Sequence, residues 1–339
     1  MSETMHNNEP GCHGPSKRAS AARRRLHGAA AVLALGAALF PFLAAGASAS
    51  TPGTSSSVQT LTPAAPGSNP AVQLAATLAQ EGDSATQVAT ALSDTYQVGT
   101  GEVTGLLTEN GYNGVEIAQA LRTVYDARDV DVVFALDSIG YSYGGVALTV
   151  SDVYGDSAAQ VIDAYGSLGL ASGAIASGVS SSLGYQPYTL STADPFNLFT
   201  PLLMGVSGAS TSEGASVLQW PANGSLDQDW YVLPSENGYA EIVDRNSGMC
   251  MSVAGNSLTP GTQLVQWPCG EANYSQDWFL GSSGTFANWS ENNWKVGVHS
   301  QLDPFLYAEV EGQSPYAGAP IDQQFWDGGW NQVWTFLQA

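Results

Sequence analysis

Between residues 70 and 184, apolar positions recur with the spacing of α-helices. Ile117 and Leu121 fall on one helical face, and after a polar turn Val132 and Leu136 begin another short one. This spacing predicts that each unit is a helix-turn-helix hairpin. Because a hairpin this short cannot bury its own apolar stripe, several must pack together.

The hairpin pattern repeats every 29 residues. The recurring glycines, expected just past the second helix of each unit, are Gly82, Gly111, Gly140 and Gly169. The recurring aliphatic residues that precede an alanine are Val88, Ile117, Val146 and Ile175. The tyrosines predicted to close the first helix are Tyr96, Tyr125 and Tyr154. We therefore predict an all-α helical-hairpin repeat array at 70–184, of no assigned family, which serves as a partner-binding surface or as a spacer.

The pattern changes after residue 199, where short runs of Trp, Tyr, Val and Thr alternate with turn residues. Such runs are typical of an all-β domain, predicted here over 199–339. The segment 185–198 has two prolines and no periodicity, which indicates a connector. The chain is thus predicted to be multidomain, with the helical array followed by the β domain.

Three segments of the β domain contain a Gln-x-Trp triplet, each followed by an apolar strand. The triplets are Gln228-Asp229-Trp230, Gln276-Asp277-Trp278 and Gln332-Val333-Trp334. A tryptophan from each repeat supplies a large apolar area to a shared core, and the glutamine amide can bond backbone groups at the turn. We expect these glutamines and tryptophans to be mainly structural.

The central repeat carries further spaced elements. It reads Asn246-Ser247-Gly248-Met249-Cys250-Met251-Ser252-Val253, then Gly261-Thr262-Gln263, Gln266-Trp267-Pro268-Cys269-Gly270 and Gln276-Asp277-Trp278. With three triplets in register, residues 199–339 resemble the ricin B-type lectins, which implies a β-trefoil that binds carbohydrate. An even cysteine count after export favours a disulfide between Cys250 and Cys269, and the resemblance implies the same pairing.

The resemblance also implies which repeat binds sugar. Members that bind sugar place an Asp two residues after the first Cys position, beside an aromatic platform and polar groups near the Gln-x-Trp. Gly205 and Ser252 stand at the acid position of the first two repeats. The third repeat offers the predicted carbohydrate-binding residues Glu309, Gln324, Trp326, Asn331 and Gln332. Glu309 is the expected hydroxyl acceptor and Trp326 the stacking platform, with Phe325 or Trp330 as alternative platforms.

The N-terminus has the features of a secretory signal. Three arginines at 23–25 precede an apolar run at 29–45 and an A-x-A-like stretch, which predicts a signal peptide at 1–50 cleaved near residues 47–51 and a secreted protein. A membrane anchor is the alternative, although the run is short and rich in Ala and Gly. Residues 51–69 are rich in Thr, Pro, Ser and Gly, which predicts a disordered linker.

Charge limits the partners of the mature chain. Removing residues 1–50 takes five of the nine basic and two of the 30 acidic residues, leaving a net charge of about −24. Such a surface repels phosphate backbones and anionic lipid, so nucleic acid and membrane insertion are disfavoured. The expected partners are neutral or cationic: glycans, of which galactose-type sugars are one class, and a protein partner or a second copy through the helical repeats.

Catalytic and metal-binding patterns are missing from the mature sequence. No G-x-S-x-G, H-E-x-x-H, Walker or D-x-D-x-D-G pattern occurs, and one histidine remains. The helical carboxylates Glu102, Glu109, Glu116 and Asp137 are not paired in a way that glycoside hydrolysis requires. The sequence thus predicts a non-catalytic lectin without cofactor or metal. The alternatives are a carbohydrate-binding module attached to a small hydrolase domain, and a degenerate trefoil that serves as a protein-interaction or adhesion scaffold.

Overall fold

A computed structural model describes residues 69–192, 194, 201–270, 273–281 and 294–339. The predicted signal peptide at 1–50 and nearly all of the predicted linker at 51–69 lie outside these residues. Within them, none of the helices combines the length and the apolar character that crossing a membrane requires.

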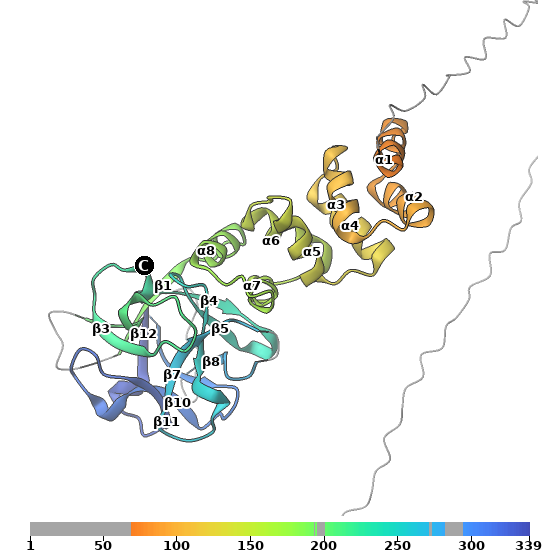
Figure 1. Cartoon of the computed structure of the whole chain (residues 1–339). Helices are drawn as coiled ribbons and strands as arrows, with labels where there is room; N and C mark the ends of the chain where they lie inside the picture. Colours follow the sequence, from red (N-terminus) through yellow and green to blue (C-terminus); the bar gives the residue numbers. More distant parts are fainter. Residues whose placement is uncertain (1–68, 193, 195–200, 271–272, 282–293) are drawn as a thin grey trace, which may run out of the picture. The chain divides into compact units, whose positions relative to one another are not determined.

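The N-terminal region consists of helices of 10 to 12 residues, seen in Figure 1 from orange to green. They are α1 (Pro70–Glu81), α2 (Ala85–Tyr96), α3 (Thr100–Glu109), α4 (Gly114–Tyr125), α5 (Asp129–Ser138), α6 (Tyr143–Tyr154), α7 (Ala158–Ser167) and α8 (Gly173–Ser182). Each even-numbered helix through α6 ends at one of the repeated tyrosines, as the sequence predicts.

Capping side chains and glycines set the ends of these helices. Ser84 and Asn113, 29 residues apart, each form a capping box at the start of α2 and α4. The repeated glycines adopt the left-handed conformation after the odd-numbered helices, for example Gly82 at φ 89° and Gly111 at φ 87°. The same chemistry at the same spacing therefore ends each hairpin in the same way.

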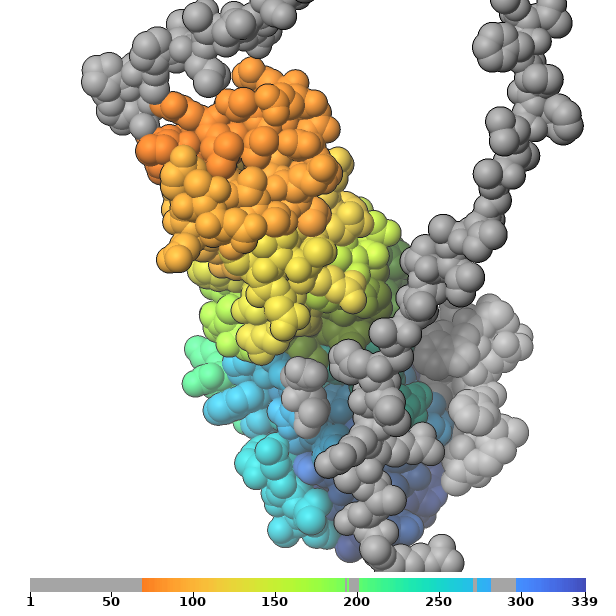
Figure 2. Space-filling view, turned by 90° about the vertical axis from the view of Figure 1, so that its right-hand side faces the viewer, coloured from red at the N-terminus to blue at the C-terminus, as the bar shows by residue number. Residues whose placement is uncertain are grey.

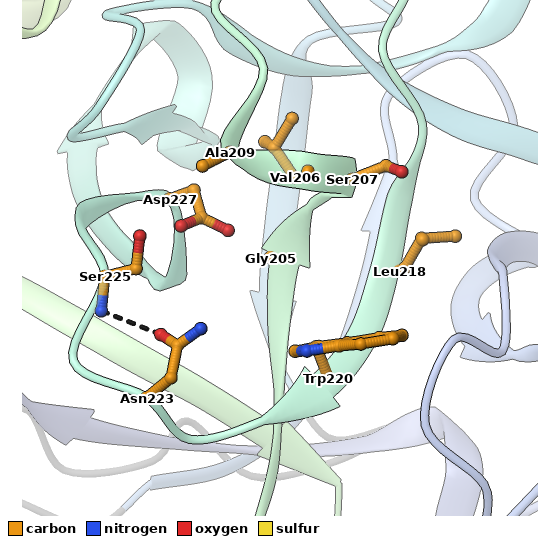
Figure 3. Close-up of a pocket in the computed structure, with 10 residues that line it drawn as sticks. Gly205, Val206, Ser207, Ala209, Leu218, Trp220, Asn223, Ser225 and Asp227 are labelled. Carbon is orange, nitrogen blue, oxygen red and sulfur yellow. Dashed lines mark hydrogen bonds between the residues drawn. The ribbon is translucent and has the colours of Figure 1, made fainter.

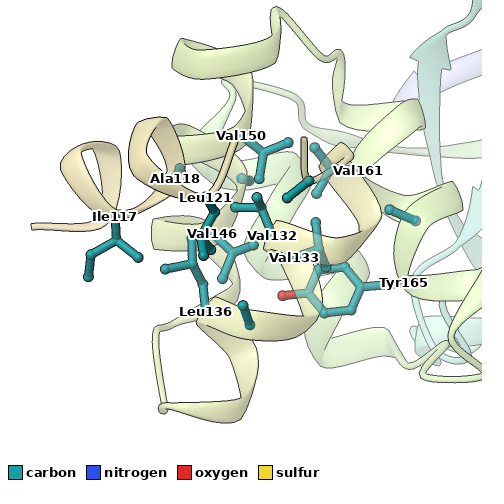
Figure 4. Packing of buried hydrophobic residues seen from close by; sticks show 14 of the residues in the cluster. Ile117, Ala118, Leu121, Val132, Val133, Leu136, Val146, Val150, Val161 and Tyr165 are labelled. Atoms are coloured by element: carbon teal, nitrogen blue, oxygen red, sulfur yellow. The ribbon is translucent and has the colours of Figure 1, made fainter. Parts of the chain in front are cut away.

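The hairpins pack on one another in sequence order. Helices α2, α4, α6 and α8 contact each other in succession, and Figure 2 shows the orange, yellow and green segments as adjoining bands. The shared interior contains fully buried aliphatic residues such as Ile117, Leu121 and Leu136, drawn in Figure 4. The repeated units thus build one continuous apolar core, as expected for an array.

The repeated tyrosines tie one unit to the previous one. The hydroxyl of Tyr125 donates to the carbonyl of Val98 at 2.9 Å, and the hydroxyl of Tyr154 donates to the carbonyl of Ala127 at 2.7 Å. Both side chains are partly buried against the apolar cluster. These tyrosines therefore serve the packing of the array.

The C-terminal region is a β structure. Its strands are β1 (Pro187–Thr192), β2 (Leu202–Val206), β3 (Val217–Pro221), β4 (Asp229–Pro234), β5 (Ala240–Asp244), β6 (Cys250–Val253), β7 (Thr262–Trp267), β8 (Asp277–Gly281), β9 (Trp294–Ser300), β10 (Leu306–Val310), β11 (Ile321–Phe325) and β12 (Val333–Gln338). All pairings between them are antiparallel.

Six of these strands close into a barrel. β1 pairs with β4, β4 with β5, β5 with β8, β8 with β9, β9 with β12, and β12 with β1. The hairpins β2–β3, β6–β7 and β10–β11 attach to β1, β5 and β9 respectively. Three hairpins on a six-stranded barrel make the predicted β-trefoil.

One boundary differs from the sequence expectation. The segment at 185–198 was expected to be a connector, but β1 lies within it and pairs with β12 over five residues. The strand escaped detection because its proline and its polar residues obscure the alternation, and only Leu190 of this strand is fully buried in the barrel core, with Tyr188 partly buried against it. The barrel therefore takes its first strand from the predicted connector.

Candidate functional site

The hairpin registers define which residues are equivalent in the three repeats. Leu203 pairs with Trp220, Cys250 with Trp267, and Tyr307 with Gln324. Two residues further along, the pairs are Gly205 with Leu218, Ser252 with Val265, and Glu309 with Asp322. The three repeats therefore share one backbone frame but present different side chains on it.

The Gln-x-Trp residues lie in the interior of each repeat. Trp230, Trp278 and Trp334 are at most 1% exposed. Their indole nitrogens donate to the carbonyls of Met204 at 3.1 Å, Met251 at 2.9 Å and Ala308 at 2.9 Å. Each tryptophan thus joins its barrel strand to the first strand of its own hairpin, with no polar atom left unpaired.

The glutamines of the triplets close the turns before them. Their Nε2 atoms donate to the carbonyls of Pro221 at 3.0 Å, Pro268 at 2.9 Å and Phe325 at 2.8 Å. In Gln228 and Gln276 the Oε1 atom also bonds the backbone, since it accepts from the backbone N–H of Asn223 and Gly270 respectively. These two glutamines therefore maintain the turn.

Gln332 differs because it also bonds a carboxylate. Its Nε2 donates to Glu309 Oε2 at 2.9 Å. Asn331 donates from Nδ2 to the carbonyl of Val310 at 3.0 Å, and its buried Oδ1 has no hydrogen-bond partner. The structure thus brings together three of the sequence-predicted residues: Glu309 on β10, and Asn331 and Gln332 in the turn before β12.

The two other predicted residues of the third repeat occupy different places. Gln324 lies opposite Tyr307, where the first two repeats have Trp220 and Trp267. Trp326 comes after the end of β11, is 38% exposed, and its ring centroid lies 4.8 Å from that of Tyr307. The register therefore places the tryptophan of the third repeat two residues later than those of the other repeats.

Burial raises the pKa values of two carboxyl groups in the third repeat. It raises the pKa of Glu309, although the hydrogen bond from Gln332 opposes the effect. Burial also raises the pKa of Asp322, to about 7, with further contributions from the charges of Glu309 and Glu311. Two carboxyl groups that face each other across a hairpin thus hold protons more tightly than in water.

The first repeat forms an open pocket that the sequence did not indicate. A cavity of about 340 Å³ is lined by the ring of Trp220, by Asn223 and by the carboxylate of Asp227 (Figure 3). Trp220 is 49% exposed, whereas Asp227 is 7% exposed and its Oδ1 has no hydrogen-bond partner. An exposed ring and a buried acceptor therefore share one pocket.

Gly205 explains how Asp227 reaches this position. A Cβ on Gly205 would lie 3.3 Å from Asp227 Oδ2 and 3.0 Å from Gln228 Cγ. The missing side chain at the family's acid position leaves room for a carboxylate from the turn before β4. The sequence analysis looked for an acid at position 205 and therefore did not predict a role for Asp227. The sequence feature that could have indicated this role is an Asp directly before the first Gln-x-Trp, at the position that Asn331 has in the third repeat.

The second repeat satisfies its polar groups internally. The hydroxyls of Ser252 and Ser275 lie 3.0 Å apart, and Ser275 also donates to Asn273 Oδ1 at 2.8 Å. Ser275 occupies the position of Asp227 and Asn331. The second repeat keeps an exposed Trp267, and it has Ser252 and Ser275 at the positions of Glu309 and Asp227.

Among the described residues, one group of three side chains of metal-binding type lies close together. It comprises Glu241, Cys250 and Cys269. The two sulfurs are bonded to each other, so the sequence expectation of a structural disulfide is confirmed. Disulfide sulfurs are not thiolates and do not offer a metal the ligands of a zinc site.

Comparison with known proteins agrees with this architecture. The family model described as ricin-type beta-trefoil lectin domain-like matches residues 188–267 and 227–296. No curated protein matches the chain. Residues 188–296 are thus a ricin B-type β-trefoil lectin-like region, and the helical array remains without an assigned family.

Several solved structures are similar to a part of this chain. They include the designed threefold-symmetric ThreeFoil, 27% identical over 45% of this chain and 99% of that chain, with a TM-score of 0.38. An exo-beta-1,3-galactanase from Clostridium thermocellum is 26% identical over 45% of this chain and 30% of that one, with a TM-score of 0.39. The Rhizoctonia solani agglutinin is 13% identical over 46% and 97% of the two chains, with a TM-score of 0.37.

Proposed function

We propose that this ricin B-type lectin region binds glycans without catalysis, through its third repeat and also through the first. The supporting observation is the distribution of buried oxygens that have no partner. Asp227 Oδ1 and Asn331 Oδ1 occupy equivalent positions and both lack a hydrogen-bond partner, whereas the equivalent Ser275 is satisfied by its neighbours. A buried acceptor without a partner is costly unless a ligand supplies a donor.

The first repeat has the chemistry that a neutral pyranose requires. The exposed face of Trp220 covers the apolar C–H side of a sugar, and Asp227 accepts two of its hydroxyl groups. Asn223 has its Oδ1 bonded to the amide of Ser225, which leaves its Nδ2 as a donor toward the ligand. Galactose-type sugars are the first class to test.

In the third repeat, Glu309 is the proposed hydroxyl acceptor. The amide of Gln332 donates to it and orients it, and Asn331 and Gln324 supply further polar groups nearby. Trp326 supplies an aromatic surface at the edge of the same hairpin, beside Tyr307. This assignment keeps the five residues expected from the sequence, although Trp326 lies two residues after the position that Trp220 has in the first repeat.

A glycan array with matched variants tests the proposal. Glu309→Gln and Asp227→Asn remove one charge-assisted acceptor each, which is worth about 1.5–3 kcal/mol and hence about 10- to 100-fold in affinity for glycans read by that repeat. Ser252→Ala, at the equivalent position of the second repeat, is the control and is expected to bind as wild type does. Folded protein that binds no glycan would contradict the proposal and favour a scaffold role.

We propose that the helical array has no catalytic activity. Glu116 bonds the backbone amide of Asn113 in a capping box, and Glu102 accepts from Asn69, so both carboxylates have structural roles at helix N-termini. Incubation of the purified protein with the glycans that it binds should leave them intact. Released sugar in proportion to protein concentration would show instead that the trefoil accompanies a small hydrolase.

We further propose that the helical array joins trefoils together or to a protein partner. Phe134 and Leu148 expose apolar side chains at 57% and 53% on its surface. Joining two weak sugar sites raises the effective affinity without new contacts to sugar. Light scattering on the mature protein is expected to show a dimer or larger species, and a strict monomer would leave a separate protein partner as the role of this surface.

A further inference from the structure

The third repeat contains a pair of carboxyl groups that the sugar-binding scheme does not use in full. Glu309 on β10 and Asp322 on β11 are direct cross-strand neighbours. Glu309 and Asp322 are 6% and 5% exposed, so both carboxyl groups are largely removed from water. Like charges directly opposite each other destabilise a strand pair, and burial increases the repulsion.

The trefoil does not require these acids. The equivalent pairs are Gly205 with Leu218 in the first repeat and Ser252 with Val265 in the second. Both pairs are uncharged, and the same hairpin forms around them. The two carboxyl groups are therefore a feature of the third repeat alone and carry a cost that folding does not explain.

The surroundings add negative charge. Glu311 acts on both carboxyl groups, and Asp327 acts on Glu309. Among the side chains that the structure describes, Arg128 and Arg245 form ion pairs with Asp131 and Asp229 and no basic group reaches the third-repeat hairpin. The charge is thus not neutralised within this part of the chain.

Two oxygens at this hairpin have no donor. Asp322 Oδ1 lacks a hydrogen-bond partner, and so does Oδ1 of Asn331, a side chain that is 1% exposed and whose amide also bonds Glu309. Glu309 uses Oε2 for Gln332. Two oxygens without a donor, close to two largely buried carboxyl groups, match a compact cation with several N–H groups.

We propose that the third repeat binds the protonated primary amine of an amino sugar, with Glu309 and Asp322 as its counter-charges. An ammonium group has three N–H donors and one positive charge, which fits two facing carboxylates and an amide oxygen. The inference rests on the proposed glycan binding and narrows it to sugars with a free amine. The acidity of the mature chain, about −24 by composition, attracts such cationic sugars from solution as well.

The experiment compares two ligands that differ only at nitrogen. Calorimetric titration at pH 7 and 0.3 M salt uses a deacetylated glucosamine dimer and its fully N-acetylated counterpart, because short ligands at high salt suppress non-specific attraction between polyions. Wild type is expected to bind the free-amine dimer at least about 10-fold more tightly, the ratio for one charge-assisted hydrogen bond. In Asp322→Asn this ratio should fall to about one.

Controls separate this inference from general charge and from the proposed function. Glu213→Gln removes an equal charge from an exposed loop of the first hairpin and should keep the wild-type ratio. Equal affinity of wild type for both dimers, or an unchanged ratio in Asp322→Asn, overturns the inference. Binding that is abolished by EDTA and restored by calcium overturns it too, because a metal then neutralises the pair.

The pattern of failure identifies which proposal fails. If neutral galactose-type glycans bind while the amine has no effect, only the amino-sugar inference falls. If no glycan of either kind binds to the folded protein, the proposed function falls with it. The variant Asp322→Asn removes a repulsive charge, so it is expected to fold.

Discussion

The first and third hairpins of the trefoil have the same backbone register but place their acids differently. In the first, a glycine on β2 leaves space for Asp227 from the following turn. In the third, Glu309 stands on the strand itself and faces a second acid across the hairpin. What recurs in all repeats builds the fold, and what differs between them marks the candidate sites.

The largest expected effect is on a residue that recurs. Trp334→Ala removes a side chain that is 1% exposed and donates to Ala308, so it should lower the free energy of unfolding by about 3–5 kcal/mol. Denaturant unfolding and near-UV circular dichroism measure this. Trp220→Ala, at an exposed ring, is the matched control and should lower glycan binding while the domain stays folded. Retained tertiary signal and stability in Trp334→Ala would contradict the structural role of the triplet.

A smaller effect is expected where the first repeat departs from the others. Gly205→Ala places a Cβ within 3.0–3.3 Å of Gln228 and Asp227 and should cost about 1–3 kcal/mol by overpacking. It should also weaken glycan binding by the first repeat, because the carboxylate is displaced. Chemical denaturation and titration with a galactose-type ligand test the two effects. Unchanged binding would show that Asp227 is not positioned by the missing side chain.

The smallest effect concerns pH. Since the pKa of Asp322 is about 7 in the folded state and lower in the unfolded chain, its contribution to stability is fully present at acid pH and is lost as the pH rises through about 7. Glu309 and Glu311 are the charged groups that act on it. Melting temperatures of wild type should therefore fall between pH 5 and pH 8 by more than those of Asp322→Asn. Parallel curves for the two proteins would show that Asp322 is not perturbed.

Much of the fold could be predicted because it depends on periodic burial. The spacing of 29 residues located the helix ends at Tyr96, Tyr125 and Tyr154, and the three Gln-x-Trp triplets located the buried tryptophans of the trefoil. Strand β1 could not be predicted, because its proline and its single fully buried core residue, Leu190, give almost no alternation. Its place depends on pairing with β12, about 150 residues away.

The candidate site was harder to predict because it depends on register. The residues of the third repeat were found from their types and order, and three of them do lie together. Residue type nevertheless made Trp326 the expected platform, whereas strand pairing places Gln324 at the position of Trp220. Asp227 was missed for the same reason, since its carboxylate reaches the site from a turn and not from the strand that carries the acid in the resembling family.

The central claim is that the trefoil binds sugar where its repeats differ, and one titration tests it most directly. The double variant Asp227→Asn, Glu309→Gln should lose affinity for every glycan that wild type binds, by about 10-fold or more, while its melting temperature stays near that of wild type. Wild-type affinity in the double variant would place the binding site elsewhere and contradict the account.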